Sequence, residues 1–145
     1  MHIGIITPAT VKSLNGNRAT AQRWAEFLRQ LGHKVDISVE WDGRPYDLMV
    51  ALHAWRSADS VAAFKQQYPE LPLVLAMTGT DLYRFINSHP EPTLASIEAA
   101  DALVTLHRLA TRVLPESAHH KVHVIHQSAL PLPKAVKRLV RHFDV

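Results

Sequence analysis

Short apolar runs that recur along the chain constrain its fold more than any other feature. Residues 48–52, Leu-Met-Val-Ala-Leu, are apolar throughout, which is the pattern of a strand covered on both faces in a parallel sheet. Short apolar runs also predict strands over residues 3–7, 71–77, 102–106 and 122–125, and residues 35–39 alternate apolar and polar side chains, as in a half-buried strand. Pro72 can stand only at the start of its strand, because a proline has no N–H group to donate within a sheet.

The segments between these runs carry helical signals. In residues 21–31 the side chains Ala21, Trp24, Leu28 and Leu31 share one face at spacings of three and four, and Gly32 is placed to cap the helix. Further helices are expected over residues 57–68, 93–99, 109–114 and, with a basic face, 134–142. Pro90 and Pro92 interrupt the chain before Thr93, which is expected to cap the helix that follows.

Strands that alternate with helices predict an α/β fold. Right-handed crossovers then give a Rossmann-like, doubly wound parallel sheet of about six strands, with helices on both faces. The expected strand order is 3-2-1-4-5-6. In such a sheet, ligands bind beyond the carboxyl ends of the strands, which here are followed by residues 8–20, 40–45, 53–57, 78–84, 107–108 and 126–129.

Composition excludes several classes of protein. A chain of 145 residues that is 47% hydrophobic and 20% charged is typical of a soluble globular protein. No apolar run reaches the roughly 18 residues of a membrane span, and no signal peptide precedes the first strand. The absence of cysteine excludes disulfides and thiolate chemistry. We therefore expect a cytoplasmic protein, without stable membrane insertion.

The polar loop at residues 15–20 separates the first strand from the first helix. Gly16 and Asn17 lie at its end, where a helix N-terminus offers free amides and a partial positive charge to an anion. Arg18 and Arg56 are able to clamp a phosphate-like group through forked hydrogen bonds. The alternative is an ordinary strand-to-helix turn with an asparagine cap.

Further polar side chains follow the third, fourth and sixth expected strands. They are His53, Arg56 and Ser57, then Thr78, Gly79, Thr80 and Asp81, and finally His126, Gln127 and Ser128. Each of them, taken singly, can cap a helix or face solvent. Their shared position at one edge of the sheet favours a functional role.

Three other kinds of site are disfavoured. A dinucleotide fingerprint needs three glycines after the first strand and only Gly16 is present, although Glu40 is placed to meet a ribose. The histidines of residues 119–126 do not assemble a metal site, because His123 and His126 point to opposite faces of a strand. The basic residues after Lys134 lack interleaved aromatic residues, so nucleic acid is not an expected partner.

Four segments resemble the glycosyltransferase-type selenosugar synthases of selenoneine biosynthesis, within the family 4 glycosyltransferases of the GT-B fold. They are residues 16–18 (Gly-Asn-Arg), residues 52–57 (Leu-His-Ala-Trp-Arg-Ser), residues 75–83 (Leu-Ala-Met-Thr-Gly-Thr-Asp-Leu-Tyr) and residues 125–129 (Ile-His-Gln-Ser-Ala). The run from Gly32 to Val35, Gly-His-Lys-Val, is common to many glycosyltransferases. The likeness extends along the whole chain.

The resemblance implies two Rossmann-like domains with the active site between them. Residues 1–130 would form the acceptor-side domain, and residues 131–145 a linker or helix leading to a nucleotide-sugar-binding domain of the same parent chain. Residues 143–145, Phe-Asp-Val, resemble the start of that second domain. On this reading the chain is a fragment, inactive alone, with a UDP-sugar as co-substrate, an anionic small molecule as acceptor, and no metal or other cofactor.

The resemblance also implies roles for the residues. His53, Thr78 and Asp81 would be catalytic, orienting the sugar and the nucleophile together with Thr80; the binding residues would be Gly16, Asn17, Arg18, Arg56, Ser57, Gly79, Thr80, Gln127 and Ser128. Many family 4 enzymes carry a histidine where this chain has Thr78. Selenophosphate is already an anion, so it needs positioning more than proton removal. The alternatives are a transferase with a hydroxyl acceptor and a stand-alone, non-enzymatic ligand-binding domain.

Overall fold

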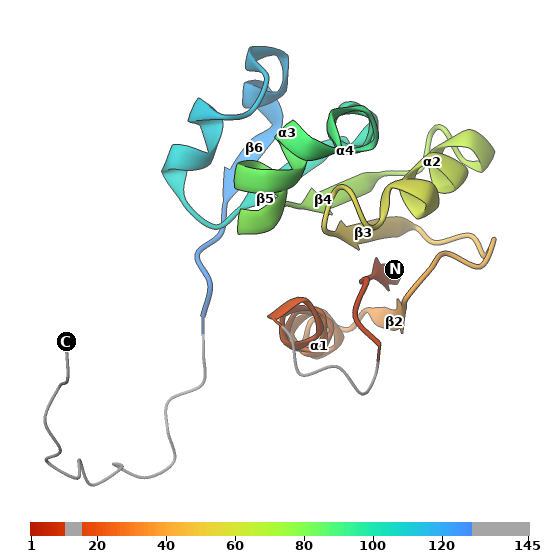
Figure 1. Ribbon diagram of the computed structural model, residues 1–145. Coiled ribbons are helices and arrows are strands. Elements are labelled where there is room, and N and C mark those ends of the chain that lie inside the picture. Colours follow the sequence, from red (N-terminus) through yellow and green to blue (C-terminus); the bar gives the residue numbers. More distant parts are fainter. Residues whose placement is uncertain (11–15, 129–145) are drawn as a thin grey trace, which may run out of the picture.

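The computed structural model describes residues 1–10 and 16–128. Within them six parallel strands form one sheet with helices on both faces (Figure 1), so the predicted α/β, Rossmann-like class is confirmed. The strands are β1 (His2–Ile6), β2 (Lys34–Ser38), β3 (Leu48–Leu52), β4 (Leu73–Ala76), β5 (Ala102–Thr105) and β6 (Val122–Val124). The helical elements are α1 (Gly16–Gln30), α2 (Ala58–Gln67), η1 (Asp81–Phe85), α3 (Ile86–Ser88), α4 (Pro90–Ala99), η2 (Arg108–Arg112) and η3 (Glu116–Lys121).

The strand order is β2-β1-β3-β4-β5-β6, so the predicted order 3-2-1-4-5-6 is wrong. Its cause is the connection between β2 and β3, which passes over β1 and places β3 on the other side of that strand. Tyr46 of this connection lies on Gly4 of β1, where an added Cβ atom would come within 2.4 Å of the tyrosine ring. The Asp47 amide also donates to the His2 carbonyl at 2.8 Å. All the strands stay parallel, and the later strands are added on the side of β1 opposite to β2.

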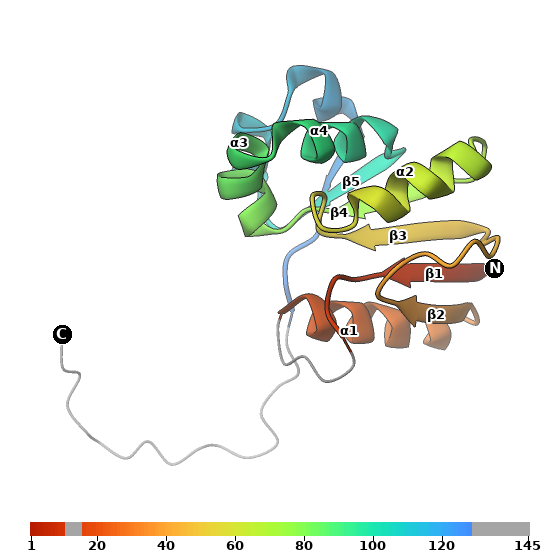
Figure 2. The ribbon, with the colours of Figure 1, turned by 45° about the vertical axis from the view of Figure 1, so that its right-hand side comes forward.

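The two faces of the sheet have different covers. Alternating strand residues such as Met49, Leu73, Leu75 and Leu103 pack under α2 and α4 and are completely buried. On the opposite face Ile3 and Ile5 pack against Ala21 and Ala25 of α1. Figure 2 shows α1 beside β1 and β2, with α2 and α4 on the other side of the sheet. Among the described helices, α1 alone covers its face.

Two predicted helix starts are wrong. The loop expected at residues 15–20 is helical from Gly16, so Asn17 and Arg18 belong to the first turn of α1. Helix α4 begins at Pro90, not after Thr93, because a proline is well tolerated in the first turn, where its missing N–H has no helical partner. The Thr93 hydroxyl instead donates to the His89 carbonyl at 2.7 Å, inside the helix.

The segment after the fourth strand, expected to be a loop, is helical from Asp81, where η1 begins. The other element predictions agree with the structure to within about two residues where they can be compared. Gly32 ends α1 with a φ of +85°, and the His33 amide donates to the Leu28 carbonyl at 3.1 Å, as in a Schellman cap. The segment expected at 109–114 is the 3₁₀ helix η2. The helix expected at 134–142 lies outside the described residues. No helix in residues 1–10 and 16–128 is long and apolar enough to cross a membrane.

Candidate active site

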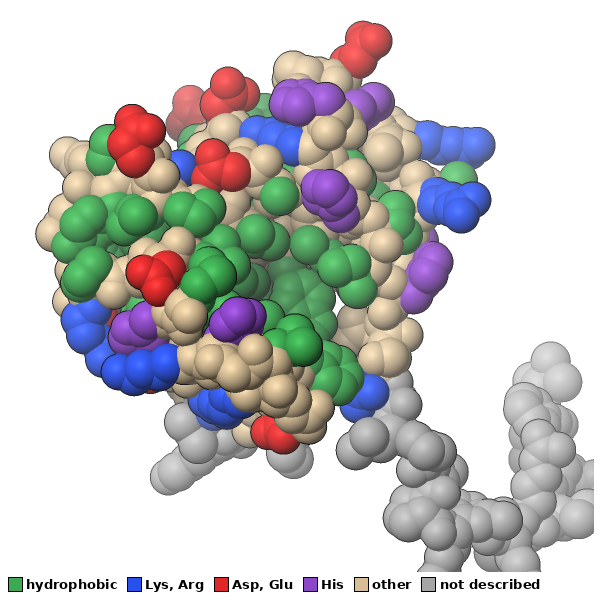
Figure 3. All heavy atoms as spheres, turned by 180° about the vertical axis from the view of Figure 1, so that it is seen from behind, with side chains coloured by type: hydrophobic (Ala, Val, Ile, Leu, Met, Phe, Trp, Pro, Cys, Tyr) green, Lys and Arg blue, Asp and Glu red, His purple; other side chains and the backbone are tan. Residues whose placement is uncertain are grey.

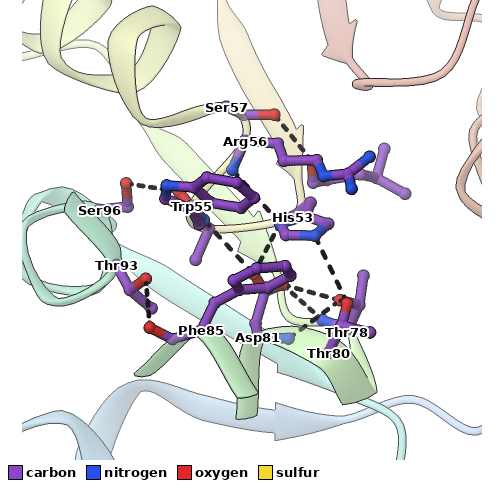
Figure 4. Close-up of polar contacts among 12 residues, drawn as sticks. His53, Trp55, Arg56, Ser57, Thr78, Thr80, Asp81, Phe85, Thr93 and Ser96 are labelled. Carbon is purple, nitrogen blue, oxygen red and sulfur yellow. Dashed lines mark hydrogen bonds and ion pairs between the residues drawn. The ribbon is translucent and has the colours of Figure 1, made fainter. Parts of the chain in front are cut away.

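His53 follows β3 directly and has an unusual backbone. Its φ of 78° lies in the left-handed region, which costs a residue other than glycine about 1–3 kcal/mol. Two hydrogen bonds hold this conformation: the His53 amide donates to the Ala76 carbonyl at 3.0 Å, and the Ser57 amide donates to the His53 carbonyl at 3.1 Å. The turn directs the imidazole toward the loop after β4 (Figure 4).

Asp81 is the partner of this imidazole. Its side chain is completely buried, and Oδ1 lies 2.7 Å from Nδ1 of His53 and 3.3 Å from the Trp55 amide. Its Oδ2 atom accepts hydrogen bonds from the amide of Thr78 at 2.9 Å and from the hydroxyl of Thr78 at 3.0 Å. One carboxylate thus joins the loop after β3 to the loop after β4, with both oxygens satisfied.

The surroundings of Asp81 act on its pKa in opposite directions. Burial by itself raises the pKa of the carboxyl, because the charged form loses its hydration. The hydrogen bond from His53, the charge this imidazole can carry, and the two donors of Thr78 lower the pKa and more than offset burial. The net pKa of Asp81 is therefore lowered, and the group is an ionised carboxylate at neutral pH.

An ionised Asp81 fixes the tautomer of His53. A carboxylate has no proton to donate, so Nδ1 of the imidazole carries the hydrogen of the 2.7 Å contact. The Arg56 amide also lies 3.3 Å from Nδ1, but it cannot share this nitrogen once the proton is there. Nε2 then carries no hydrogen and accepts one from the hydroxyl of Thr80, which lies 3.4 Å away.

Thr80 connects the buried pair to solvent. It is exposed, as is Gly79 beside it, and its hydroxyl lies 2.9 Å from that of Thr78. A proton can therefore pass between Nε2 of His53 and a bound molecule through the Thr80 hydroxyl. The predicted catalytic residues His53, Thr78 and Asp81 form one hydrogen-bonded cluster, which is the arrangement of a general acid–base pair with an orienting carboxylate.

An aromatic cluster beside the pair was not predicted. The rings of Trp55 and Phe85 stack with centroids 4.3 Å apart, and the centroid of Phe85 lies 5.3 Å from that of His53. Exposed Arg56 lies over Trp55, with its guanidinium carbon 5.8 Å from the ring centroid. Trp55 lies within residues 52–57, one of the segments that carry the family resemblance, and this was the signal by which it could have been assigned to the site. No sequence signal assigned Phe85 to the site, since an aromatic residue in a helix is usually part of the core.

Ser57 has a structural contact. Its side chain is buried, and the hydroxyl donates to the carbonyl of Leu52 at 2.8 Å, across the turn that contains His53. This bond leaves the predicted substrate-binding hydroxyl directed toward the end of β3. Ser57 therefore supports the left-handed turn, while Arg56 is the member of the segment that reaches the surface.

The other predicted binding residues gather around the first half of α1. Gly16 and Asn17 are in its first turn, and Gln127 and Ser128 bond to it: Gln127 donates to the Thr20 hydroxyl at 2.9 Å, and Arg23 donates to the Ser128 hydroxyl at 3.0 Å. Arg18 lines a hollow of about 630 Å³ between α1 and β2, together with residues such as Asp36 and Arg44. Neither His53 nor Arg56 lines that hollow.

A second polar pair stands at the end of β5. The Tyr83 hydroxyl lies 3.1 Å from Nε2 of His107, and the two rings are parallel within 4°, with centroids 6.1 Å apart. His107 belongs to an edge loop that the sequence indicated, but neither residue was predicted as part of the site. In residues 1–10 and 16–128, no group of three or more histidine or acidic side chains is arranged to hold a metal ion.

Comparison with known proteins does not identify a family for this chain. No protein-family model matches the chain, and no curated protein matches it. What the structure shows is the Rossmann-like α/β fold and, at the carboxyl edge of its sheet, a buried imidazole–carboxylate pair beneath two exposed loop residues.

Proposed function

We propose that this chain is the acceptor-side domain of a glycosyltransferase, and that its acceptor is selenophosphate. One observation carries the proposal. The segments 52–57 and 75–83, on which the family resemblance chiefly rests, are far apart in sequence, yet the 2.7 Å contact between His53 and Asp81 joins them. Three of their exposed members, Arg56, Gly79 and Thr80, then lie above this pair at the carboxyl edge, where sheets of this class bind ligands.

In the proposed reaction, selenium attacks the anomeric carbon of a UDP-sugar. A selenium lone pair forms the new bond to carbon while the bond from carbon to the UDP oxygen breaks, and UDP leaves with that electron pair. The acceptor is an anion, so Arg56 and Thr80 would hold its oxygens and His53 would steady Thr80. The nucleotide sugar would bind on a second domain of the parent protein.

The geometry also favours a second candidate, a transferase with a hydroxyl acceptor. A hydroxyl is a weak nucleophile and gains from a base that removes its proton. His53 has the required form, because Asp81 fixes the proton on Nδ1 and leaves Nε2 facing the exposed Thr80 hydroxyl at 3.4 Å. In this candidate, an imidazole from the loop after β3 supplies the base that many family 4 enzymes place after the fourth strand.

The test is a transfer assay on the protein purified from its native source. It is incubated with UDP-glucose or UDP-N-acetylglucosamine and selenophosphate, and the products are analysed by mass spectrometry and for released UDP. We expect a selenium-containing sugar and stoichiometric UDP. If UDP is released only with hydroxyl acceptors, the selenophosphate proposal is wrong and the second candidate, a transferase with a hydroxyl acceptor, takes its place. Absence of transfer to any acceptor would overturn the glycosyltransferase proposal and favour a ligand-binding domain.

Two matched variants test the site. His53→Gln removes the imidazole that positions Thr80, and we expect kcat/KM with selenophosphate to fall. With a hydroxyl acceptor, where His53 would be the base, the expected loss is about 100-fold, the lower end of what a positioned acid or base contributes. His120→Gln makes the same change at an exposed position in η3 and should leave transfer unchanged. Normal transfer by His53→Gln, with the fold intact by circular dichroism, would remove the pair from the mechanism.

A further inference from the structure

The face of the sheet that carries α1 is open over most of its width. Between α1 and the strands β3, β4, β5 and β6 lies a groove of about 1500 Å³. Its floor is apolar and includes Val50, Val74 and Val104. Viewed from behind, hydrophobic side chains gather in a hollow near the middle of the molecule (Figure 3). Such a groove is larger than most small-molecule pockets, which measure roughly 300–1,000 Å³.

The strand residues that face this groove are less buried than their neighbours on the other face. In β4, Leu73 and Leu75 are 0% exposed, whereas Val74 between them is only partly buried. On opposite sides of the groove, Phe27 of α1 is 44% exposed and Ile125 after β6 is 49% exposed. A doubly wound sheet is covered by helices on both faces, so this surface lacks a cover among the described residues.

The chain itself returns to this groove. After β6 it crosses from the far edge of the sheet to α1, where Gln127 and Ser128 hydrogen-bond to Thr20 and Arg23. Both Gln127 and Ser128 line the groove. Ser128, the last described residue, therefore stands at the rim of the groove, near the carboxyl ends of the strands.

The sequence that follows has the pattern of an amphipathic helix. Val136, Leu139, Val140 and Phe143 recur at spacings of three and four, which places them on one helical face. Lys134, Lys137, Arg138 and Arg141 recur in the same way on the opposite face. Pro133 suits the start of such a helix, since a proline is favoured in the first turn.

We propose that residues 134–143 form a helix that packs in this groove with Val136, Leu139, Val140 and Phe143 against the strands. Residues 129–133 can span up to about 17 Å when extended, and a helix of residues 134–143 is about 15 Å long, close to the length of a five-residue strand. The helix starts at the carboxyl edge and runs back along the strands, as α1 does, with its basic face in solvent. The inference is independent of the proposed function.

Hydrogen exchange on the full chain tests the proposal. We expect the amides of residues 134–143 to exchange about 100-fold more slowly than in an unstructured chain. Leu139→Gln should abolish this protection, because it places an amide in the apolar contact. Arg138→Gln is the matched control on the opposite face and should preserve it. Unprotected amides in the unaltered chain, or equal effects of the two variants, would overturn the proposal.

A spin label distinguishes the occupant of the groove. The chain contains no cysteine, so Ile125→Cys provides a single attachment point at the groove. A nitroxide there should broaden the amide signals of residues 134–143 within the same molecule. Broadening that appears only between copies in a mixture of spin-labelled and isotope-labelled chains would show that a second copy fills the groove. Protection that appears only with anionic lipid vesicles would assign the segment to a membrane surface; either result overturns the proposal.

Discussion

The two faces of the sheet differ in how far they are completed by the described residues. The face under α2 and α4 is closed: Leu73, Leu75 and Leu103 are fully buried, and the His53–Asp81 pair lies at its carboxyl end with its polar atoms satisfied. The face that carries α1 is closed only over β1 and β2 and presents an apolar groove elsewhere.

This difference indicates two separate tasks within one small sheet. On the closed face, a rigid core holds a strained turn and a buried imidazole–carboxylate pair in one geometry, as positioning of a reacting group requires. On the open face, the exposed apolar surface has the character of an interaction surface. Each of the following experiments compares a change on the closed face with a change elsewhere.

Loss of the buried carboxylate should have the largest effect. Asp81→Ala leaves the Nδ1–H of His53 and the amide of Thr78 without their acceptor in a buried site, so we expect the free energy of unfolding to fall by about 3–5 kcal/mol. Urea denaturation measures the change. Glu70→Ala, at an exposed position, should alter stability by no more than about 0.5 kcal/mol. A similar small loss for Asp81→Ala would mean that the pair does not organise this face.

Truncation of a leucine on each face compares their packing directly. Leu73→Ala, at a fully buried position under the helices, should lower the free energy of unfolding by about 2–5 kcal/mol. Leu48→Ala makes the same change at a partly buried position in the groove and should cost roughly half as much. Chemical denaturation of the two variants measures both losses in the free energy of unfolding. Equal losses would contradict the difference in packing between the two faces.

The contact that fixes the strand order can be broken by one methyl group. In Gly4→Ala the new Cβ atom would lie 2.4 Å from the buried ring of Tyr46, so the connection between β2 and β3 must shift. We expect a loss of about 1–3 kcal/mol in the free energy of unfolding. Gly79→Ala is the matched control, because no atom lies within 4 Å of its added Cβ. Unchanged thermal stability of Gly4→Ala would show that this packing does not hold the order.

The smallest effect concerns pH. The pKa of Asp81 is lowered from its ordinary value of 3.8 in the folded protein, so its ionisation stabilises the fold above that value, and this stabilisation is lost as pH falls through the folded pKa. The stability advantage of the unaltered chain over Asp81→Asn should therefore be constant near neutrality and shrink below pH 3.8. Urea midpoints measured for both proteins from neutral to acidic pH give this difference. A gap that widens on acidification would contradict a lowered pKa.

Much of the candidate site could be predicted because it follows the carboxyl ends of strands. His53 and Thr78 stand directly after apolar runs and Asp81 follows three residues later; polar residues at that position are expected at the ligand-binding edge of a parallel sheet. Phe85 could not be predicted, since its role depends on stacking with Trp55, which lies in another segment of the chain. Ser57 could not be assigned for a similar reason: whether a hydroxyl meets a ligand or a nearby carbonyl depends on backbone geometry at the end of β3.

The sequence by itself determined the six strands, the longer helices α1, α2 and α4, and the parallel sheet, because these follow from apolar spacing and from the alternation of strands with helices. It did not indicate η1 or η3. Only the tertiary structure decided the strand order. In the predicted order two strands separate β3 from β4, which would place their loops about 14 Å apart. In the structure the two strands are neighbours, with Leu52 paired to Ala76, and so His53 reaches Asp81. The physical reason is the packing of Tyr46 on Gly4, a contact between distant segments that no local pattern contains.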